Sequence, residues 1–241
     1  MISLKGKNAL ITGSSRGVGQ QLARALAQLG CNIIVHGRTL ESCTKTLVLL
    51  KNSEVKVFCV AGELSDEKQV NDVIKQVRAL NIQVDILYNN AAIMTPFYTD
   101  YWNHSWDEWM LTMKVNVFAM YSLCKAFIPD MIENGFGRVI NLSSGIMNQP
   151  ELAPYGASKW AVNKLTDDIA FKLRNTKVRI NTLDPGWLRT DMGGTNAEHP
   201  VEAVLPGALA PALIDDDGPN GQFFSSINHN LDMVLFNKLL A

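Results

Sequence analysis

The chain has 241 residues, 47% of them hydrophobic, and its 22 basic and 23 acidic residues leave a net charge of −1 at pH 7. This length suits one α/β domain over residues 1–241, and the apolar fraction is enough to bury a large core. The balanced charge indicates no nucleic acid and no membrane surface as a partner, so the function has to be sought in a local site.

The cysteines and histidines show no pattern typical of metal binding, because there is no CxxC pair and no ligand-like spacing between the two residue types. We therefore expect no metal, and reduced cysteines of the kind found in cytoplasmic proteins. No apolar run approaches a signal peptide or the roughly 18 residues of a membrane span. The residues concerned are Cys31, Cys43, Cys59, Cys124, His36, His104, His199 and His229.

Short apolar runs alternate with longer stretches of helical spacing along the chain. We predict, in order, a strand at 8–11, a helix at 17–29, a strand at 32–36, a helix at 40–50, a strand at 55–60, a helix at 66–80, a strand at 85–88, a helix at 106–132, a strand at 138–142, a helix at 155–173, and strands at 178–183 and 222–225. Such alternation favours parallel strands joined by right-handed crossovers, with helices covering both faces of the sheet. The predicted fold is a Rossmann-type, doubly wound parallel sheet in three α/β/α layers.

Residues 187–219 break this alternation. They contain Gly193, Gly194, Pro200, Pro206, Gly207 and Pro211, and few apolar residues at regular spacing. Segments with few buried contacts open locally, and long loops are usually functional or disordered. We therefore predict a substrate lid here.

A glycine-rich turn follows the first strand, with Gly13, Gly17 and Gly19 in the run TGSSRGVG. Small residues let the backbone approach a pyrophosphate, and the helix beginning near Gly17 directs free N–H groups toward it. Glycine also occurs in turns without ligands, so the signal depends on its position at the first strand–helix junction.

Tyr155 and Lys159 lie four residues apart, on one face of the helix predicted at 155–173. Reduction of a carbonyl needs a proton donor, and a phenol with a pKa of about 10 is a weak one at neutral pH. A neighbouring ammonium favours the phenolate and is expected to lower that pKa. In isolation, the pair would be read as a surface tyrosine packed on a lysine stem.

Four motifs together resemble the short-chain dehydrogenase/reductase family: TGSSRGVG, NNAA at 89–92, YGASK at 155–159 and DPGWLRTDM at 184–192. The resemblance extends from about residue 5 to about residue 224, with Ala92 where the family usually has glycine. The later runs RTDMGG and DGPNGQFF also resemble a carbonyl-reductase-like subset. The resemblance implies an NAD(P)-dependent oxidoreductase that acts on a small-molecule carbonyl or alcohol.

The resemblance assigns catalytic roles to Tyr155 and Lys159 and to two further residues. Ser144, at the end of the strand predicted at 138–142, would hydrogen-bond the substrate oxygen. Ser143 stays open as an alternative, because the interval from Ser144 to Tyr155 is a little short for the family. Asn116 would hold, through its backbone carbonyl, a water that links Lys159 to a proton relay.

The resemblance likewise implies a set of cofactor-binding residues, in which Glu63 and Leu64 contact the adenine and the segment after Asp184 wraps the nicotinamide. The full set is Gly13, Ser15, Arg16, Gly17, Val18, Gly19, Arg38, Glu63, Leu64, Asn90, Ala91, Tyr155, Lys159, Pro185, Gly186, Leu188 and Thr190.

NADP(H) is expected rather than NAD(H). NAD-specific Rossmann enzymes carry an acid at the end of the second strand, where it binds the ribose hydroxyls and repels a 2′-phosphate. Here Gly37 takes that position, Arg38 follows, and Arg16 lies in the glycine-rich turn. Two guanidiniums can bind one phosphate from both sides.

Two other functions remain possible from the sequence: a catalytically silent NADP(H)-binding regulator, since fold does not fix function, and, less favoured, a sugar-nucleotide epimerase or dehydratase. The helices predicted at 106–132 and 155–173 are apolar on more than one face, which favours a homodimer or homotetramer. The pocket is expected to be mostly apolar and to suit a hydrophobic ketone or aldehyde. Its candidate residues are Met94, Phe97, Met147, Gln149 and Trp187.

Overall fold

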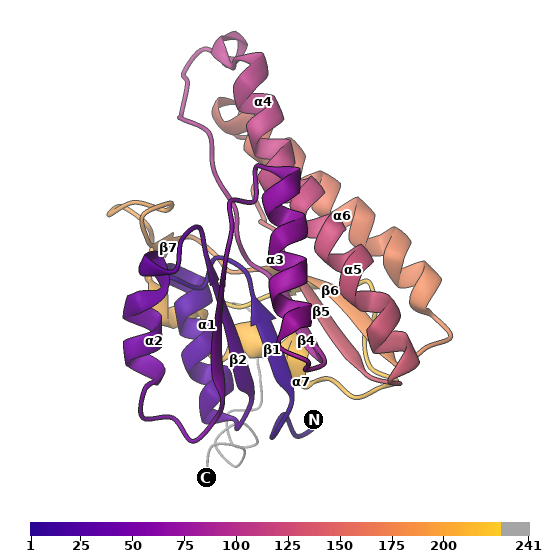
Figure 1. The fold of residues 1–241 in the computed structure, drawn as a ribbon. Helices are drawn as coiled ribbons and strands as arrows, with labels where there is room; N and C mark the ends of the chain where they lie inside the picture. The colour runs from indigo at the N-terminus through magenta and orange to yellow at the C-terminus, as the bar shows by residue number, and fades with distance from the viewer. Residues whose placement is uncertain (228–241) are drawn as a thin grey trace.

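Seven parallel strands form one sheet in the order β3-β2-β1-β4-β5-β6-β9 in the computed structural model, which describes residues 1–227 (Figure 1). His229 and the end of the expected domain at residue 241 lie outside the described residues. The order reverses between β1 and β4, as in doubly wound sheets, so the predicted fold is confirmed. The strands are β1 (Asn8–Ile11), β2 (Asn32–Gly37), β3 (Val57–Ala61), β4 (Ile86–Asn89), β5 (Gly137–Leu142), β6 (Val178–Asp184) and β9 (Phe223–Ser225).

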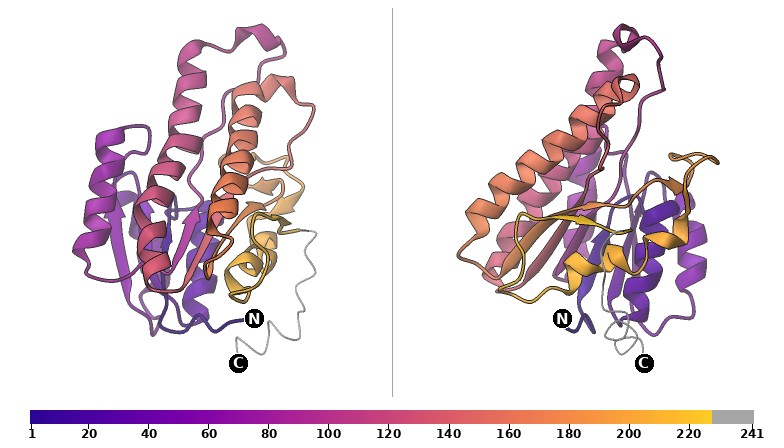
Figure 2. Two further views of the ribbon diagram at one scale, coloured as in Figure 1. Left: turned by 90° about the vertical axis from the view of Figure 1, so that its right-hand side faces the viewer. Right: turned by 180° about the vertical axis from the view of Figure 1, so that it is seen from behind.

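Helices cover both faces of the sheet (Figures 1 and 2). Alternate residues of a strand point to opposite faces, so Leu10 packs in the core on one face and Ile11 in the core on the other. This two-sided burial is the reason that the strands are apolar without interruption. The main helices are α1 (Gly17–Gln28), α2 (Thr44–Leu50, preceded by the 3-10 turn Glu41–Cys43), α3 (Glu67–Ala79), α4 (Trp106–Met113), α5 (Met120–Glu133) and α6 (Ala153–Leu173).

The segment expected to be a lid divides into two parts. Residues 187–200 are mostly exposed and contain the short strands β7 (Leu188–Arg189) and β8 (His199–Pro200), which pair with each other. Residues 201–213 instead pack in the core beside α1 and β5, as η5 (Val201–Val204), η6 (Gly207–Leu209) and α7 (Ala210–Leu213). The lid proposal therefore keeps only residues 187–200 of the predicted 187–219. Buried residues such as Val204 and Leu209 hold 201–213 in the core, and Arg138 fastens Ile214 and Asp216 in the remaining stretch.

The helix predicted at 106–132 contains a π-helical stretch, Lys114–Ala119, between α4 and α5. Extra-wide turns of this kind are rare and often mark functional sites, and this one contains Asn116. The whole stretch Trp106–Glu133 has the length and hydropathy of a membrane span, but 56% of its most apolar window is buried inside the protein. Its buried side chains, such as Leu123 and Phe127, belong to the core, and the stretch is a core helix.

The amino end of β5 contains a buried arginine, Arg138. The side chain of Arg138 is fully buried and donates to the carbonyls of Gly137, Lys177 and Ile214 at 2.9 to 3.1 Å. It also pairs with Asp216 at 2.7 Å. Arg138 thereby fastens the chain that follows α7 to the sheet.

Candidate active site

The glycine-rich turn after β1 is packed so tightly that no side chain would fit at Gly13 or Gly19. A Cβ on Gly13 would lie 2.9 Å from the Cα of Ala91, and one on Gly19 would lie 2.6 Å from the carbonyl oxygen of Gly13. Gly13 and Gly17 also have positive φ angles of 62° and 58°, which glycine adopts without strain. The obstacles at Gly13 and Gly19 include backbone atoms that cannot rotate away, so both positions require glycine and present no side chain of their own to a ligand.

The helix that starts in this turn, α1, has no side-chain cap and no acidic residue in its first turn. Its first N–H groups therefore receive no hydrogen bond from a capping side chain, and the positive end of the helix dipole is not offset by a carboxylate. Such a terminus favours an anion, and a pyrophosphate suits the glycine-rich turn described above.

The turn at the end of β4 supports the glycine-rich turn from the side. Asn90 donates from Nδ2 to the carbonyl of Thr12 at 2.7 Å, while the backbone N–H groups of Asn90 and Ala91 donate to the Thr12 hydroxyl. Ala92 is accommodated beside this contact. Of the adenine candidates, Leu64 is buried with Val115, and the Glu63 carboxylate accepts a hydrogen bond from the backbone N–H of Ser65 at 3.2 Å.

The loop after β6 reaches the same turn. Gly186 has a φ of 80°, Leu188 is buried, and the Cβ that Gly17 lacks would lie 3.6 Å from the side chain of Thr190. This loop therefore runs from the end of β6 toward the glycine-rich turn, and it contains the predicted residues Pro185, Gly186, Leu188 and Thr190. The other members of the predicted set, Ser15 and Val18, lie in that turn and at the start of α1, half buried.

Ser144, Tyr155 and Lys159 converge where β5 ends. The side chain of Ser144 lies beside the phenol of Tyr155 and acts to lower its pKa, and the Ser144 hydroxyl accepts the N–H of Ile146 at 3.2 Å. Lys159 is buried, its Nζ lies 5.5 Å from the Tyr155 ring centroid, and it donates to the carbonyl of Leu142 at 2.8 Å. The Ser144 hydroxyl, the Tyr155 phenol and the Lys159 amine thus lie together at the carboxyl end of the sheet, the end at which the glycine-rich turn also lies.

Ser143, the alternative to Ser144, points elsewhere. Its hydroxyl donates to Asn163 on α6 at 2.6 Å, and its side chain is buried beneath the end of the sheet. Consecutive residues at a strand end point to opposite sides, so only one of the two serines can face Tyr155, and the geometry favours Ser144.

Asn116 links three parts of the site through its side chain. It accepts from the N–H of Ile93 and donates to the carbonyl of Ile93, both at 2.9 Å, and it also donates to Ser158 on α6 at 2.9 Å. Ser158 in turn donates to the carbonyl of Tyr155 at 2.7 Å. Asn116 therefore joins the π-helical stretch, the loop after β4 and the first turns of α6.

Burial dominates the ionisation of the Tyr155–Lys159 pair. It raises the pKa of Tyr155 to about 12, and the Asp184 charge adds to this increase while the Ser144 hydrogen bond opposes it. Burial also lowers the pKa of Lys159 to about 8, with Asp184 opposing this decrease. The expected lowering of the phenol pKa is not found, because the Lys159 amine is directed at the Leu142 carbonyl and desolvation of the phenol outweighs any stabilisation of the phenolate.

Residues 7–200 match the sequence family described as short chain dehydrogenase. The chain belongs to this family. It is 34% identical over 215 residues to a 3alpha-hydroxysteroid dehydrogenase of Mediterraneibacter gnavus, covering 88% of this chain and 82% of the relative. It is also 34% identical over 204 residues to a dehydrogenase/reductase SDR family member 4 of Bos taurus, covering 82% and 71%.

Solved structures share the fold of this short-chain dehydrogenase. A gluconate 5-dehydrogenase from Burkholderia cenocepacia, in complex with NADP and tartrate, superposes with a TM-score of 0.80 at 29% identity, covering 92% of this chain and 94% of that one. The relatives are named for oxidoreductases, and this short-chain dehydrogenase belongs to an oxidoreductase family.

Two residues that sequence reasoning missed shape the site. His36, at the end of β2, accepts the N–H of Gly13 on Nδ1 at 3.1 Å, so its Nε2 carries the proton that points to the Gly62 carbonyl at 3.2 Å. Burial lowers the pKa of His36 to about 4, which keeps the ring neutral and able to accept from Gly13. Its place at the end of a buried strand could have indicated this role.

Asp184, the last residue of β6, is the second. A Cβ on Gly145 would lie 2.8 Å from its Oδ2, so the carboxylate adjoins the residue that follows Ser144, and Oδ1 accepts the N–H of Gly186 at 3.0 Å. Its charge reaches both Tyr155 and Lys159. Only the sheet register brings it to them, so no local motif could have predicted the contact.

The two arginines near the end of β2 differ in this short-chain dehydrogenase. Arg16 pairs with Asp191 at 2.9 Å, an ion pair between exposed side chains (65% and 74%). Arg38 is exposed and has no ion pair within the described residues. A side chain at Gly37 would displace its neighbours, because a Cβ there would lie 2.3 Å from the hydroxyl of Ser42 and 2.7 Å from the sulfur of Cys43.

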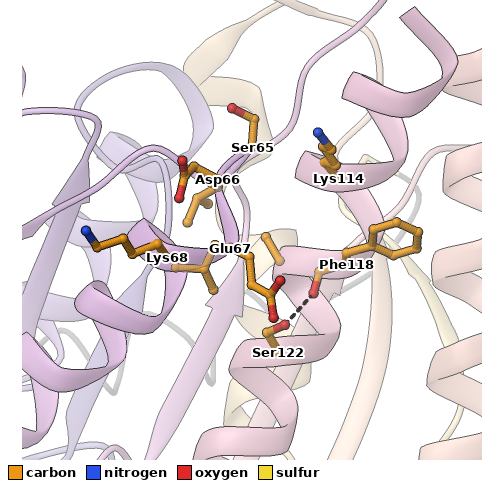
Figure 3. Close-up of a pocket in the computed structure, with 10 residues that line it drawn as sticks. Ser65, Asp66, Glu67, Lys68, Lys114, Phe118 and Ser122 are labelled. Atoms are coloured by element: carbon orange, nitrogen blue, oxygen red, sulfur yellow. Dashed lines mark hydrogen bonds between the residues drawn. The ribbon is translucent and has the colours of Figure 1, made fainter. Parts of the chain in front are cut away.

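A separate pocket of about 610 Å³ opens between the start of α3 and the π-helical stretch (Figure 3). Its lining mixes acids such as Asp66 and Glu67 with Lys68 and Lys114. Neither Tyr155 nor Lys159 lines it, but Leu64, one of the adenine candidates, does, so the pocket adjoins the expected adenine end of the cofactor site.

Proposed function

We propose that this chain is an NADP(H)-dependent oxidoreductase that interconverts a carbonyl and a secondary alcohol, with Tyr155 as the general acid and base. The observation that carries the proposal is the convergence of Ser144, Tyr155 and Lys159 at the end of β5, beside a turn built to receive a pyrophosphate. A protein that only bound the nucleotide would have no use for a phenol, a hydroxyl and a buried amine at one point.

NADP(H), when bound, supplies or accepts the hydride. The chain would hold its pyrophosphate at Gly13, Gly17 and Gly19, and its nicotinamide end along the loop after Asp184. Binding to N–H groups rather than to charged side chains suits the turn, since α1 has neither a cap nor an acid at its start.

In the reductive direction, Tyr155 donates its proton to the carbonyl oxygen as negative charge develops there. Ser144 donates a hydrogen bond to the same oxygen, and preorganised donors of this kind stabilise the transition state. The Lys159 ammonium stabilises the phenolate that Tyr155 leaves, and Asn116 fixes the first turns of α6 that carry both residues. A phenol with a pKa of about 12 is fully protonated at neutral pH, which suits reduction.

The proposal is tested by screening purified protein for NADPH oxidation against a panel of ketones and aldehydes. We expect turnover with at least one carbonyl compound. Rates indistinguishable from those without protein across the panel would contradict the proposal.

The decrease of kcat at alkaline pH should follow the deprotonation of the Lys159 ammonium. Its pKa of about 8 means that the ammonium is present below that pH and is lost above it, whereas Tyr155 stays protonated to about pH 12. We expect kcat for reduction to be level at pH 6–7 and to fall as the pH passes about 8. Asp184→Asn removes an anion that raises the pKa of Lys159, so it should move this decrease to lower pH.

The matched control is Asp217→Asn, which makes the same change at an exposed residue before β9. It should leave the decrease where it is. A decrease that stays at the same pH in Asp184→Asn, or that moves equally in both variants, would show that another group controls it.

Discrimination for the 2′-phosphate is assigned to Arg38. It is exposed and unpaired, whereas Arg16 has to leave Asp191 before it can contribute. A charge-assisted hydrogen bond contributes roughly 1.5–3 kcal/mol, so Arg38→Ala should weaken NADPH binding about tenfold or more and change NADH binding little. Binding titrations of both nucleotides, with Arg24→Ala at an exposed arginine of α1 as a control, check this. Wild-type preference for NADH, or an equal loss for both nucleotides, would refute it.

The remaining proposals concern the cellular location, the oligomeric state and the substrate lid. All four cysteines are free, which agrees with a cytoplasmic location. Large apolar side chains remain exposed on the two helices that we expect to pair in a homodimer or homotetramer, and residues 187–200 are the part of the chain that we propose as a lid. The exposed side chains are those of Trp106, Leu111, Phe118, Tyr121, Trp160 and Phe171.

A further inference from the structure

Three loops leave the carboxyl ends of the adjacent strands β4, β5 and β6 and border the Ser144–Tyr155 pair. They comprise residues 90–105, 143–152 and 185–200. The N–H of Tyr98 donates to the carbonyl of Glu151 at 3.2 Å, which joins the first two loops. Their side chains therefore determine which substrates can approach the phenol.

These loops offer no lysine or arginine that is free to bind an anion. The first two contain neither lysine nor arginine. The third contains Arg189, whose guanidinium donates to the carbonyls of Ala197 and Glu198 at 2.9 and 3.1 Å and so holds its own loop together. No lysine or arginine in the three loops is therefore free to neutralise a substrate carboxylate or phosphate.

Anions dominate the same loops instead. Asp100, Glu151, Asp191 and Glu198 lie in them, and Asp184 adjoins Gly145 at the end of β6. Among residues 1–227, the cations that reach this rim in an ion pair are Arg16, which is occupied by Asp191, and, when protonated, His199, which is paired with Glu198. A negatively charged substrate would meet repulsion here and would lose its hydration without gaining a partner.

Large apolar side chains on each loop are exposed to solvent. Phe97 is 62% exposed, Met147 68% and Trp187 57%. Trp187 is held in place, because its indole N–H donates to the carbonyl of Gly193 at 2.9 Å. Covering such surfaces is favourable in proportion to the apolar area removed from water, so they favour a partner with an apolar body.

We propose that the substrate is an uncharged carbonyl compound with a bulky apolar body that packs on Phe97, Met147 and Trp187, and that the site discriminates against carboxylates and phosphates. This inference rests on the proposed oxidoreductase function. It separates the chain from the solved relative that is named as a gluconate 5-dehydrogenase, since gluconate carries a carboxylate.

The test compares three ketones on one ring: cyclohexanone, 4-tert-butylcyclohexanone and 4-oxocyclohexanecarboxylate, each with NADPH at pH 7. We expect kcat/KM to be highest for the tert-butyl ketone and about ten- to hundredfold lower for the carboxylate. Met147→Ser and Phe97→Ser should lower kcat/KM for the tert-butyl ketone severalfold more than that for cyclohexanone, whose ring offers less apolar surface to cover. Leu49→Ser, an exposed apolar residue on α2, is the control and should change neither.

Glu151→Lys tests the charge argument directly, since the bond that joins the loops uses the Glu151 backbone and survives the change. It should raise kcat/KM for the carboxylate selectively, whereas Glu54→Lys at an exposed distant position should not. Carboxylate turnover equal to or faster than that of the tert-butyl ketone in wild type would overturn this inference alone. No NADPH oxidation with any of the three ketones or with the wider panel would overturn the proposed function, and this inference with it.

Discussion

Tyr155→Phe is expected to lower kcat by about 10²- to 10⁴-fold, the range by which positioned general acids accelerate reactions. The substitution removes the only atom of Tyr155 that can donate a proton and leaves the ring, which packs near the Lys159 amine. NADPH binding should therefore stay close to that of wild type. Steady-state kinetics with the best carbonyl substrate, together with a fluorescence titration of NADPH, separate the two effects.

Tyr121→Phe is the matched control, because Tyr121 is an exposed tyrosine on α5 that takes no part in the site. It should leave kcat unchanged. Lys159→Ala should damage both turnover and NADPH binding, since it removes the buried amine beside the Tyr155 ring and frees the Leu142 carbonyl at the end of β5. A Tyr155→Phe enzyme that keeps more than about a tenth of wild-type kcat would rule out Tyr155 as the proton donor.

Arg138→Met is expected to lower the free energy of unfolding by about 3–5 kcal/mol. The arginine satisfies three carbonyls in a region that water does not reach, and each buried acceptor left without a donor costs roughly 1–3 kcal/mol. Methionine keeps much of the volume but none of the donors. Urea denaturation followed by circular dichroism measures the change.

Asp216→Asn tests whether the ion pair or the carbonyl contacts carry this stability. Asp216 is 41% exposed, and exposed ion pairs contribute about 0–1 kcal/mol, so its loss should be small. Equal destabilisation by Arg138→Met and Asp216→Asn would show that the ion pair, and not the set of carbonyl contacts, is the main contribution.

The strands and the helix pattern could be predicted because each depends on local spacing. Leu10 and Ile11 signal a strand buried on both faces, and the helix from Gly17 begins where the sequence places it. Tyr155 and Lys159 could be identified for the same reason, since four residues on a helix place two side chains on one face.

What could not be predicted depends on contacts between distant segments. Residues 201–213 look like a loop because their short helical turns give the apolar side chains no regular period, yet Val204 and Leu209 are fully buried beside α1. The pairing of Arg16 with Asp191 arises because the loop after β6 reaches the glycine-rich turn, and the position of Asp184 beside Gly145 arises because β6 pairs with β5. No pattern of sequence spacing encodes such a path.

The burial of residues 201–213 gives the loop at 187–200 two fixed ends, one at β6 and the other in the core. For a loop tethered in this way, doubling its length adds only about 0.6 kcal/mol of closure entropy. Insertions or deletions between Trp187 and Pro200 should therefore change the rim of the active site at little cost to folding. Changes in the length of this loop can therefore alter which substrates bind while the sheet stays the same.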